Sequence, residues 1–168
     1  EVSSGTSRLV GGGSYMTRWL EWQKAWLMFL DAPFIGQGWG SYSFNSFWYH
    51  DQVATLGDPR ENNLFSHCHN LVLQLLAEVG LFGTVLLVVP VGYTLFKAFI
   101  KHIENTMTFG LVMICVISLI HSMVELPLWH NNFFIVFFIV FCLIVRQVMS
   151  VNDDSMESAA RQSSLEPA

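Results

Sequence analysis

Charged residues are scarce in this sequence. Only 12% of its 168 residues are Asp, Glu, Lys or Arg, whereas 52% are hydrophobic, and the mean hydropathy is +0.44. A soluble domain typically carries about 25% charged residues, so the composition disfavours a water-soluble protein. The eight Lys and Arg residues are scattered along the chain, which excludes the clustered basic surface of a nucleic-acid-binding protein. The composition therefore predicts a membrane protein whose partners include no nucleic acid.

Cysteine is also rare, and its placement suggests no disulfide framework. Cys115 and Cys142 lie in apolar runs and Cys68 stands alone. His67-Cys68-His69 could offer metal ligands, but a zinc site needs about three protein ligands and no second Cys/His cluster exists. We therefore predict neither a metal nor a cofactor. The chain also lacks an initiator methionine and a signal-peptide pattern, so we expect the C-terminal part of a longer polytopic protein.

Long apolar runs are what the sequence does contain. Three of them cover about residues 71–99, 108–124 and 132–148, close to the roughly 20 residues that cross a bilayer. Pro90 is expected to kink the first. The connections are too short for a buried bundle in water, and no strand pattern occurs. We predict an all-α polytopic membrane protein with about three transmembrane helices in a membrane domain at 71–149, followed by a disordered cytoplasmic tail at 150–168.

Residues 1–70 are predicted to form a periplasmic loop that contains an amphipathic helix at about 14–31. Its large apolar residues follow helical spacing: Trp19, Trp22, Trp26, Phe29 and Leu30. Arg18, Glu21 and Lys24 make the segment too charged to span a membrane. Such a helix is typical of the membrane–water interface, so the lipid bilayer is an expected partner. Gly36-x-Gly38-x-Gly40 follows no strand and lacks dinucleotide spacing, so we interpret it as turns.

Basic residues predict the orientation. Lys97 and Lys101 lie between the first two spans and Arg146 ends the third, which puts those ends in the cytoplasm. The opposite ends then face the periplasm of a bacterial inner membrane. Most of the chemically useful side chains fall on that side: Arg8, Arg18, Arg60, His67, His69, His121 and Glu125.

His69 lies where the first span begins. If Asn70 caps that helix, the positive end of the helix dipole favours a neutral imidazole that can act as a base. The same helix end could instead receive a phosphate. The alternative is that His69 only hydrogen-bonds a loop carbonyl.

Arg18, Glu125 and their neighbours each have a structural alternative. Arg18 is one turn from Glu21, so an exposed intrahelical pair is the default, and diphosphate binding is the functional reading. His121 and Glu125 are four residues apart, so on a helix they would share a face, either as functional groups or as mutually satisfied partners. Gln74 and Glu78, spaced by four from Asn70, are interpreted as packing contacts.

Three groups of residues then occur in a characteristic order. The first is Arg18-x3-Trp22-x2-Ala25-x2-Met28. The second is Pro33-x2-Gly36-x-Gly38-Trp39-Gly40-x-Tyr42. The third is His67-x-His69-Asn70-Leu71-x2-Gln74-Leu75-Leu76-x-Glu78-x-Gly80-Leu81-x-Gly83. This order resembles the superfamily of O-antigen ligases, O-antigen polymerases and bacterial O-oligosaccharyltransferases. His121-Ser-Met-Val-Glu125-Leu-Pro127-Leu-Trp129 looks most like the protein-glycosylating branch, which includes the pilin glycosylation ligases.

The resemblance implies a metal-independent glycosyltransferase of the inner membrane. Such enzymes take a glycan from a polyprenyl (undecaprenyl) diphosphate carrier, and in this branch the acceptor is a Ser or Thr hydroxyl of a periplasmic or pilus protein. The family's loop arginine and the histidine of its His-Asn-Leu motif fall on Arg18 and His69. We assign catalysis to His69, Arg18 and Glu125. The assigned substrate-binding residues are Arg8, Arg60, His67, Asn70 and His121.

Other functions remain open at this level. Within the same superfamily, the alternatives are ligation to lipid A core and polymerisation of O-antigen. A transporter would usually place its polar groups near the bilayer midplane, whereas these are expected at one surface. A non-enzymatic membrane anchor would tolerate substitution of Arg18, His69 and Glu125.

Overall fold

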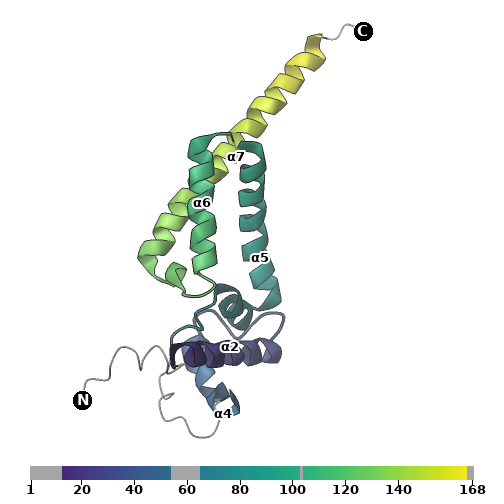
Figure 1. The fold of residues 1–168 in the computed structure, drawn as a ribbon. Coiled ribbons are helices and arrows are strands. Elements are labelled where there is room, and N and C mark those ends of the chain that lie inside the picture. Colours follow the sequence, from purple (N-terminus) through teal and green to yellow (C-terminus); the bar gives the residue numbers. More distant parts are fainter. Residues whose placement is uncertain (1–12, 54–64, 103, 166–168) are drawn as a thin grey trace, which may run out of the picture. The chain divides into compact units, whose positions relative to one another are not determined.

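The computed structural model describes residues 13–53, 65–102 and 104–165, and every regular element in these ranges is a helix (Figure 1). In chain order the elements are α2 (Gly13–Asp31), α3 (Tyr42–Asn45), η1 (Ser46–Tyr49), α4 (His50–Val53), α5 (Leu71–His102), α6 (Thr106–His121), η3 (Pro127–Trp129) and α7 (Asn131–Leu165). The predicted all-α class is therefore confirmed. The chain forms two compact units, Glu1–Leu87 with Ser122–Leu126, and Val88–His121 with Pro127–Ala168.

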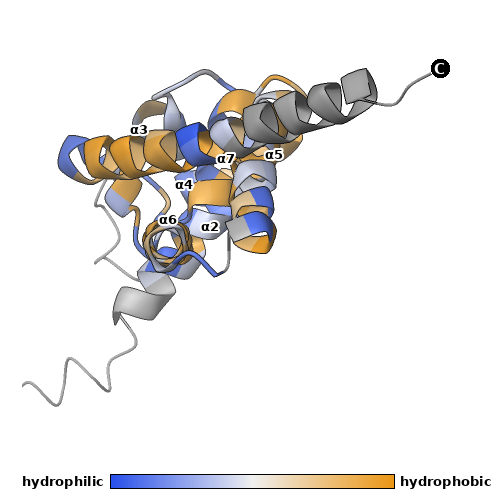
Figure 2. Ribbon diagram, turned by 90° about the horizontal axis from the view of Figure 1, so that it is seen from above, coloured by the Kyte–Doolittle hydropathy of each residue, from blue (hydrophilic) through white to orange (hydrophobic). Residues whose placement is uncertain are grey.

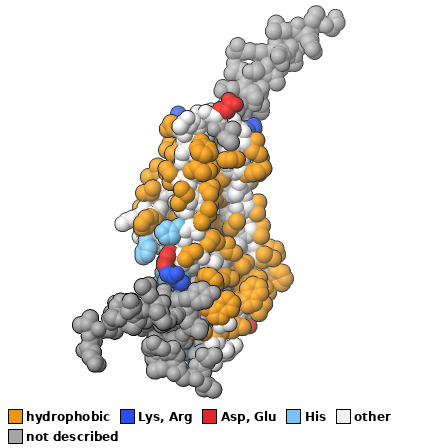
Figure 3. Space-filling view, in the orientation of Figure 1, with side chains coloured by type: hydrophobic (Ala, Val, Ile, Leu, Met, Phe, Trp, Pro, Cys, Tyr) orange, Lys and Arg blue, Asp and Glu red, His pale blue; other side chains and the backbone are white. Residues whose placement is uncertain are grey.

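The second unit packs three helices around an apolar core. The core comprises Leu95 and Ala98 of α5, Val112 and Cys115 of α6, and Ile144 and Val148 of α7. Hydrophobic side chains also cover much of the outside of these helices (Figure 3). Hydrophobic residues colour most of α7 up to the part drawn in grey (Figure 2). An apolar exterior over an apolar core suits a lipid environment rather than water.

Two helices are long and apolar enough to cross a membrane, Leu71–Lys101 and Asn131–Ser150. The third predicted span is shorter than expected, because α6 ends at His121 instead of continuing to Val124. Its 16 residues rise only about 24 Å at 1.5 Å per residue, less than the roughly 30 Å of a hydrocarbon core. The structure thus supports two spans by length, and the count of three stays a prediction.

The first span is interrupted at Gly80 rather than at Pro90. Gly80 has φ +67° and ψ −171°, outside the helical region, whereas Pro90 lies inside helical backbone. Helix α5 therefore has a short first part, Leu71–Val79, and a long second part after the break. Asn70, Gln74 and Glu78, expected to continue into the membrane, lie before this break. They belong to the same compact unit as α2, whereas we predicted a membrane domain from residue 71.

The loop after α2 packs directly on the break in α5. The Gln37 and Gly38 amides donate to the carbonyls of Ala77 and Glu78, at 3.0 and 2.8 Å. In return, the Leu81 and Phe82 amides donate to Pro33 and Phe34, at 2.8 and 3.1 Å. The loop thus satisfies backbone groups that the break releases from the helical ladder.

Gly36 and Gly80 allow the two backbones to meet. Both have positive φ, and a Cβ on Gly36 would lie 2.4 Å from the carbonyl carbon of Glu78. A Cβ on Gly80 would lie 2.5 Å from the amide nitrogen of Gly36. We interpreted the glycine motif as simple turns, and the structure shows that it also forms the contact surface between loop and helix.

Helix α2 has nearly the predicted bounds, but it buries a different face than its pattern suggests. Ala25 and Met28 are buried with Tyr42, Cys68 and Ala77 in the core of the first unit. Glu21 and Lys24 are also buried, 2% and 5% exposed, whereas Trp19 and Trp26 are 47% exposed. The charged face is turned inward because it finds polar partners there.

Helix α7 continues to Leu165, so most of the tail that we predicted to be disordered from residue 150 is helical. The residues from 156 to 161 include good helix formers, Met, Glu, Ala and Arg. A helix already formed as a span can be extended by such residues without a new nucleation cost.

Candidate functional site

Glu125 joins the two residues that we assigned most specifically from the sequence. One carboxylate oxygen, Oε1, accepts a hydrogen bond from Nη2 of Arg18 in an ion pair. The other, Oε2, lies 3.3 Å from Nδ1 of His69. Arg18 and Glu125 are about one-third and two-fifths exposed, and His69 is one-fifth exposed. All three belong to the first unit and form one accessible cluster.

The sequence places these residues far apart, and the segment Ser122–Leu126 brings Glu125 to the others. The Leu71 amide donates to the carbonyl of Ser122 at 2.8 Å. Nδ2 of Asn70 donates to the carbonyl of Met123 at 3.1 Å. The segment is thereby held at the start of α5, beside His69.

Asn70 caps α5, which is the condition on which the interpretation of His69 depended. Its Oδ1 accepts the Leu73 amide at 3.1 Å, the usual N-cap hydrogen bond. Because its amide group also holds Met123, Asn70 connects the helix start with the segment that carries Glu125. Its assignment as a substrate-binding residue stays a prediction, since the contacts seen here are made within the protein.

His69 has φ +58°, a left-handed conformation that is uncommon outside glycine. The residue before it is well anchored: the Cys68 amide donates to Oε1 of Gln74 at 2.9 Å, and its thiol donates to the Asn70 carbonyl. Burial raises the pKa of the Cys68 thiol to about 12. Cys68 therefore stays protonated and is not a nucleophile at neutral pH; it positions the backbone that turns His69 toward Glu125.

A buried polar network lies behind the cluster and supports it. Glu78 accepts the amides of Gly40 and Tyr42, at 2.9 and 3.2 Å, and a hydrogen bond from Nε2 of Gln74. The Tyr42 hydroxyl donates to Oε2 of Glu21 at 2.8 Å. Burial, followed by the nearby Glu21 charge, raises the pKa of Tyr42. Gln74 and Glu78 are thus packing contacts, as expected, but Glu78 binds the glycine loop and Gln74 binds Cys68 and Glu78 rather than another span.

Lys24 neutralises Glu21 inside this network. Nζ of Lys24 lies 2.6 Å from Oε1 of Glu21. A buried carboxylate without a partner would be strongly destabilising, and the pair together with the Tyr42 hydroxyl satisfies it. The prediction of an exposed Arg18–Glu21 pair is therefore wrong. Glu21 binds Lys24 and Tyr42, which leaves Arg18 available to Glu125.

The remaining assigned residues lie in different places. The His67 ring is 4.4 Å from the His69 ring, so it flanks the cluster. His121 is the exposed last residue of α6 and belongs to the other unit. Because α6 ends there, His121 and Glu125 do not share a helical face as expected. Arg8 and Arg60 lie outside the described residues.

The arrangement places the imidazole of His69 and the guanidinium of Arg18 on the same carboxylate. An ionised carboxylate only accepts hydrogen bonds, so in a neutral imidazole this contact places the proton of His69 on Nδ1 and leaves Nε2 as an acceptor. Arg18 gives Glu125 one of its donors and keeps others, since a guanidinium has five N–H groups. Among the described residues, no group of three or more His, Cys, Asp or Glu side chains is arranged to hold a metal ion.

Sequence comparison supports the resemblance described above. Residues 10–88 match the sequence model of a family described as O-antigen ligase. The matched range contains Arg18, His69 and the buried network, and Glu125 lies beyond it. The match does not separate one branch of the superfamily from another. No curated protein and no solved structure matches the chain significantly.

Proposed function

We propose that the protein transfers an oligosaccharide from a polyprenyl diphosphate carrier to Ser or Thr hydroxyls of periplasmic or pilus proteins. The reaction takes place at the periplasmic face of a bacterial inner membrane. The observation that carries this proposal is the bridge that Glu125 forms between Arg18 and His69. The family match to O-antigen ligases supports glycan transfer, and the two long apolar helices suit a membrane enzyme.

The bridge suggests a separate role for each of the three residues. Nε2 of His69 accepts the proton of the acceptor hydroxyl as its oxygen bonds to the anomeric carbon of the sugar. The bond from that carbon to the diphosphate oxygen breaks, and the diphosphate leaves with the electron pair. Arg18 stabilises the negative charge on the departing diphosphate. Glu125 orients the imidazole and stabilises the cation that forms on it, as a carboxylate does for a catalytic histidine.

His67, Asn70 and His121 are proposed to contact the acceptor or the glycan, and Arg8 and Arg60 to add positive charge for the diphosphate. Protein is favoured as acceptor by the sequence from Glu125 to Trp129, which resembles the protein-glycosylating branch. Lipid A core and a growing polysaccharide are the alternative acceptors for the same chemistry.

The decisive experiment offers all acceptors to the full chain in membranes. Labelled glycan on polyprenyl diphosphate is supplied with a purified pilin-type protein, with lipid A core, or with unlabelled carrier-linked glycan, each with and without chelator. We expect label on the protein in both conditions. Label only on lipid A core, or only longer sugar chains, would assign the other acceptor, and loss of transfer with chelator would contradict metal independence.

Replacement of the base tests the site itself. His69→Ala is expected to lower the transfer rate by about 10²–10⁴-fold, the usual contribution of a general base. Membrane insertion and thermal stability should change little, because the side chain is only partly buried and, among the described residues, its hydrogen bond is the one to Glu125. A wild-type rate in this variant would contradict the assignment.

A further inference from the structure

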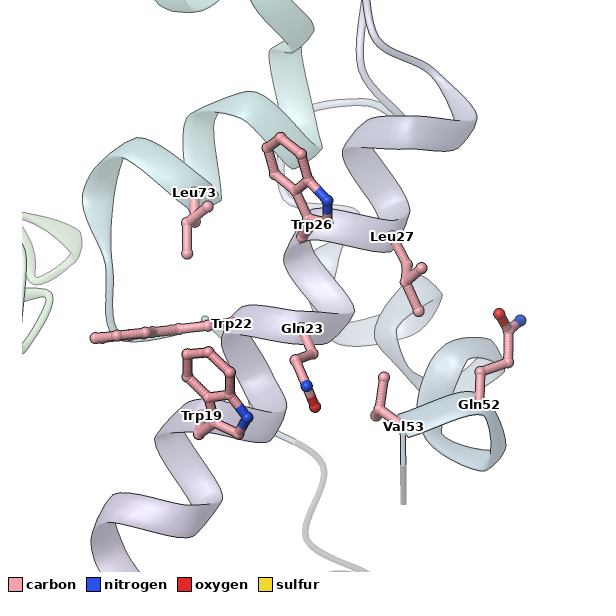
Figure 4. Close-up of a pocket in the computed structure, with 8 residues that line it drawn as sticks. All are labelled: Trp19, Trp22, Gln23, Trp26, Leu27, Gln52, Val53 and Leu73. Carbon is pink, nitrogen blue, oxygen red and sulfur yellow. The ribbon is translucent and has the colours of Figure 1, made fainter. Parts of the chain in front are cut away.

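A cavity of about 530 Å³ lies on the first unit, close to the proposed site (Figure 4). Its lining is formed by Trp19, Trp22, Gln23, Trp26 and Leu27 of α2, Gln52 and Val53 of α4, and Leu73 of α5. Figure 4 shows three indoles on successive turns of α2, with the Trp22 ring between Leu73 and Trp19. The volume lies within the range of about 300–1,000 Å³ that is usual for ligand sites.

The lining has the chemistry of a carbohydrate site. A pyranose ring has apolar C–H faces, which pack on the negative face of an indole, and hydroxyl groups at its edge. The three tryptophans provide such faces, and Gln23 and Gln52 can each donate and accept hydrogen bonds. Among the residues that the structure describes, none of those lining the cavity is charged. A polyprenyl tail would cover the half-buried Gln23 without offering it a hydrogen-bond partner, which costs free energy, so the lining favours a sugar over a lipid chain.

The cavity adjoins Arg18. A smaller cavity of about 90 Å³ is lined by Arg18, Trp19, Trp22 and Val124. It therefore shares Trp19 and Trp22 with the large cavity. A group bound at the guanidinium and a ring stacked on the indoles would be neighbours. The Trp22 indole N–H is buried and has no hydrogen-bond partner among the described residues, so the shared wall also contains a donor that those residues do not use.

We infer that this cavity is a glycan subsite, in which a neutral pyranose ring of the carrier-linked oligosaccharide stacks on the tryptophans of α2. The inference rests on the proposed function, because it takes the ligand from that reaction. The subsite holds the sugar while Arg18 binds the diphosphate. It sets glycan specificity separately from the reacting groups, and its loss raises the KM for the donor more than it lowers kcat.

Binding of the free glycan tests this inference without catalysis. The probe is the oligosaccharide that mild acid releases from the cell's own polyprenyl diphosphate pool, titrated against the full chain in nanodiscs by saturation-transfer NMR. We expect Trp26→Leu and Gln23→Leu each to weaken binding by about tenfold, the scale of one lost stacking or hydrogen-bond contact. Trp26→Phe, which keeps a smaller aromatic face, should lie between wild type and Trp26→Leu.

Two further variants serve as controls. Trp48→Leu changes a tryptophan that is 65% exposed and does not line the cavity, so glycan binding should be unchanged. Arg18→Ala should also retain binding of the free glycan, which has no diphosphate.

Wild-type affinity in both Trp26→Leu and Gln23→Leu would overturn the subsite. The subsite would also be overturned if the protein bound polyprenol and Trp26→Leu abolished that binding while glycan binding persisted. Glycan binding at this cavity without any transfer activity would support the subsite and contradict the proposed function.

Discussion

At the scale of single residues, the site depends on the carboxylate of Glu125, whose two oxygens have different partners. Glu125 holds a cation with one oxygen and an imidazole with the other. Arg18 and His69 were recognisable in the sequence through their motifs. Glu125 was also assigned, but its pairing with Arg18 was not predicted, because the two residues are 107 positions apart and Glu21 is a nearer candidate by helical spacing. The sequence signal for Glu125 was its own motif, whereas its partners depended on where the chain folds back.

Arg18→Lys separates charge from geometry. Lysine keeps the positive charge but loses the planar fork that can hold Glu125 and a diphosphate together. We expect kcat/KM for the carrier-linked donor to fall by about 10- to 100-fold, comparable to the loss of one positioned donor at a transition state. Steady-state transfer kinetics measure this effect. Full activity with lysine would argue that Arg18 acts only as a point charge.

Glu125→Gln removes the charge and keeps the size of the side chain. The amide can still contact His69, but it no longer stabilises an imidazolium or forms an ion pair with Arg18. We expect kcat to fall by about 10- to 100-fold, as is typical when the partner of a functional histidine is lost. Glu104→Gln, at an exposed acidic residue of the other unit, is the matched control and should leave the rate unchanged. Equal rates in the two variants would remove Glu125 from the mechanism.

At the scale of elements, the break in α5 and the glycine loop depend on each other. Backbone groups of the loop hydrogen-bond to the backbone groups of α5 that the break at Gly80 leaves unpaired. Glu78, in the last turn before the break, accepts hydrogen bonds from amides of the loop. This contact fixes the start of α5 relative to α2, and with it His69 relative to Arg18. Proline is the usual cause of a helix kink, so the sequence pointed to Pro90; only the packing against the loop identifies Gly80.

Gly36→Ala tests the contact between loop and helix. The new Cβ would lie 2.4 Å from backbone atoms of Glu78, in a residue with φ +68°. Gly40→Ala is the matched control, because Gly40 also has positive φ but no atom lies within 4 Å of its Cβ position. We expect Gly40→Ala to lower the free energy of unfolding by about 1–2 kcal/mol, the cost of left-handed backbone.

Gly36→Ala should cost clearly more than Gly40→Ala, because it adds a backbone clash to the same strain. Thermal unfolding in detergent, followed by circular dichroism, compares the two variants. Similar melting temperatures would show that the loop and α5 are not in close contact.

At the scale of the whole molecule, the chain divides into a unit that contains the proposed site and a unit of three apolar helices suited to lipid. The first unit holds the buried ions and the exposed site, whereas the second exposes hydrophobic side chains around an apolar core. The predicted orientation, with basic residues in the cytoplasm and the site outside, is a proposal that follows from Lys97, Lys101 and Arg146.

Single cysteines can test that orientation. Ser66 is exposed beside His67, and Glu104 is exposed between α5 and α6. In intact spheroplasts, a membrane-impermeant maleimide should label Ser66→Cys at once and Glu104→Cys only after permeabilisation. The unmodified protein, whose Cys68 and Cys115 are buried and whose Cys142 is exposed on the apolar helix α7, gives the background. The opposite pattern would place the site in the cytoplasm and exclude a periplasmic acceptor.

The sequence by itself determined the helical class, the bounds of α2, the cap at Asn70 and the resemblance to glycan-transferring enzymes. These depend on local periodicity, capping chemistry and short motifs, which act over a few residues. Only the tertiary structure decided that α2 buries Glu21 and Lys24, that the first span breaks at Gly80, and that Arg18 pairs with Glu125. The physical reason is that a buried charge or a broken helix is tolerated only where distant parts of the chain supply the missing partners.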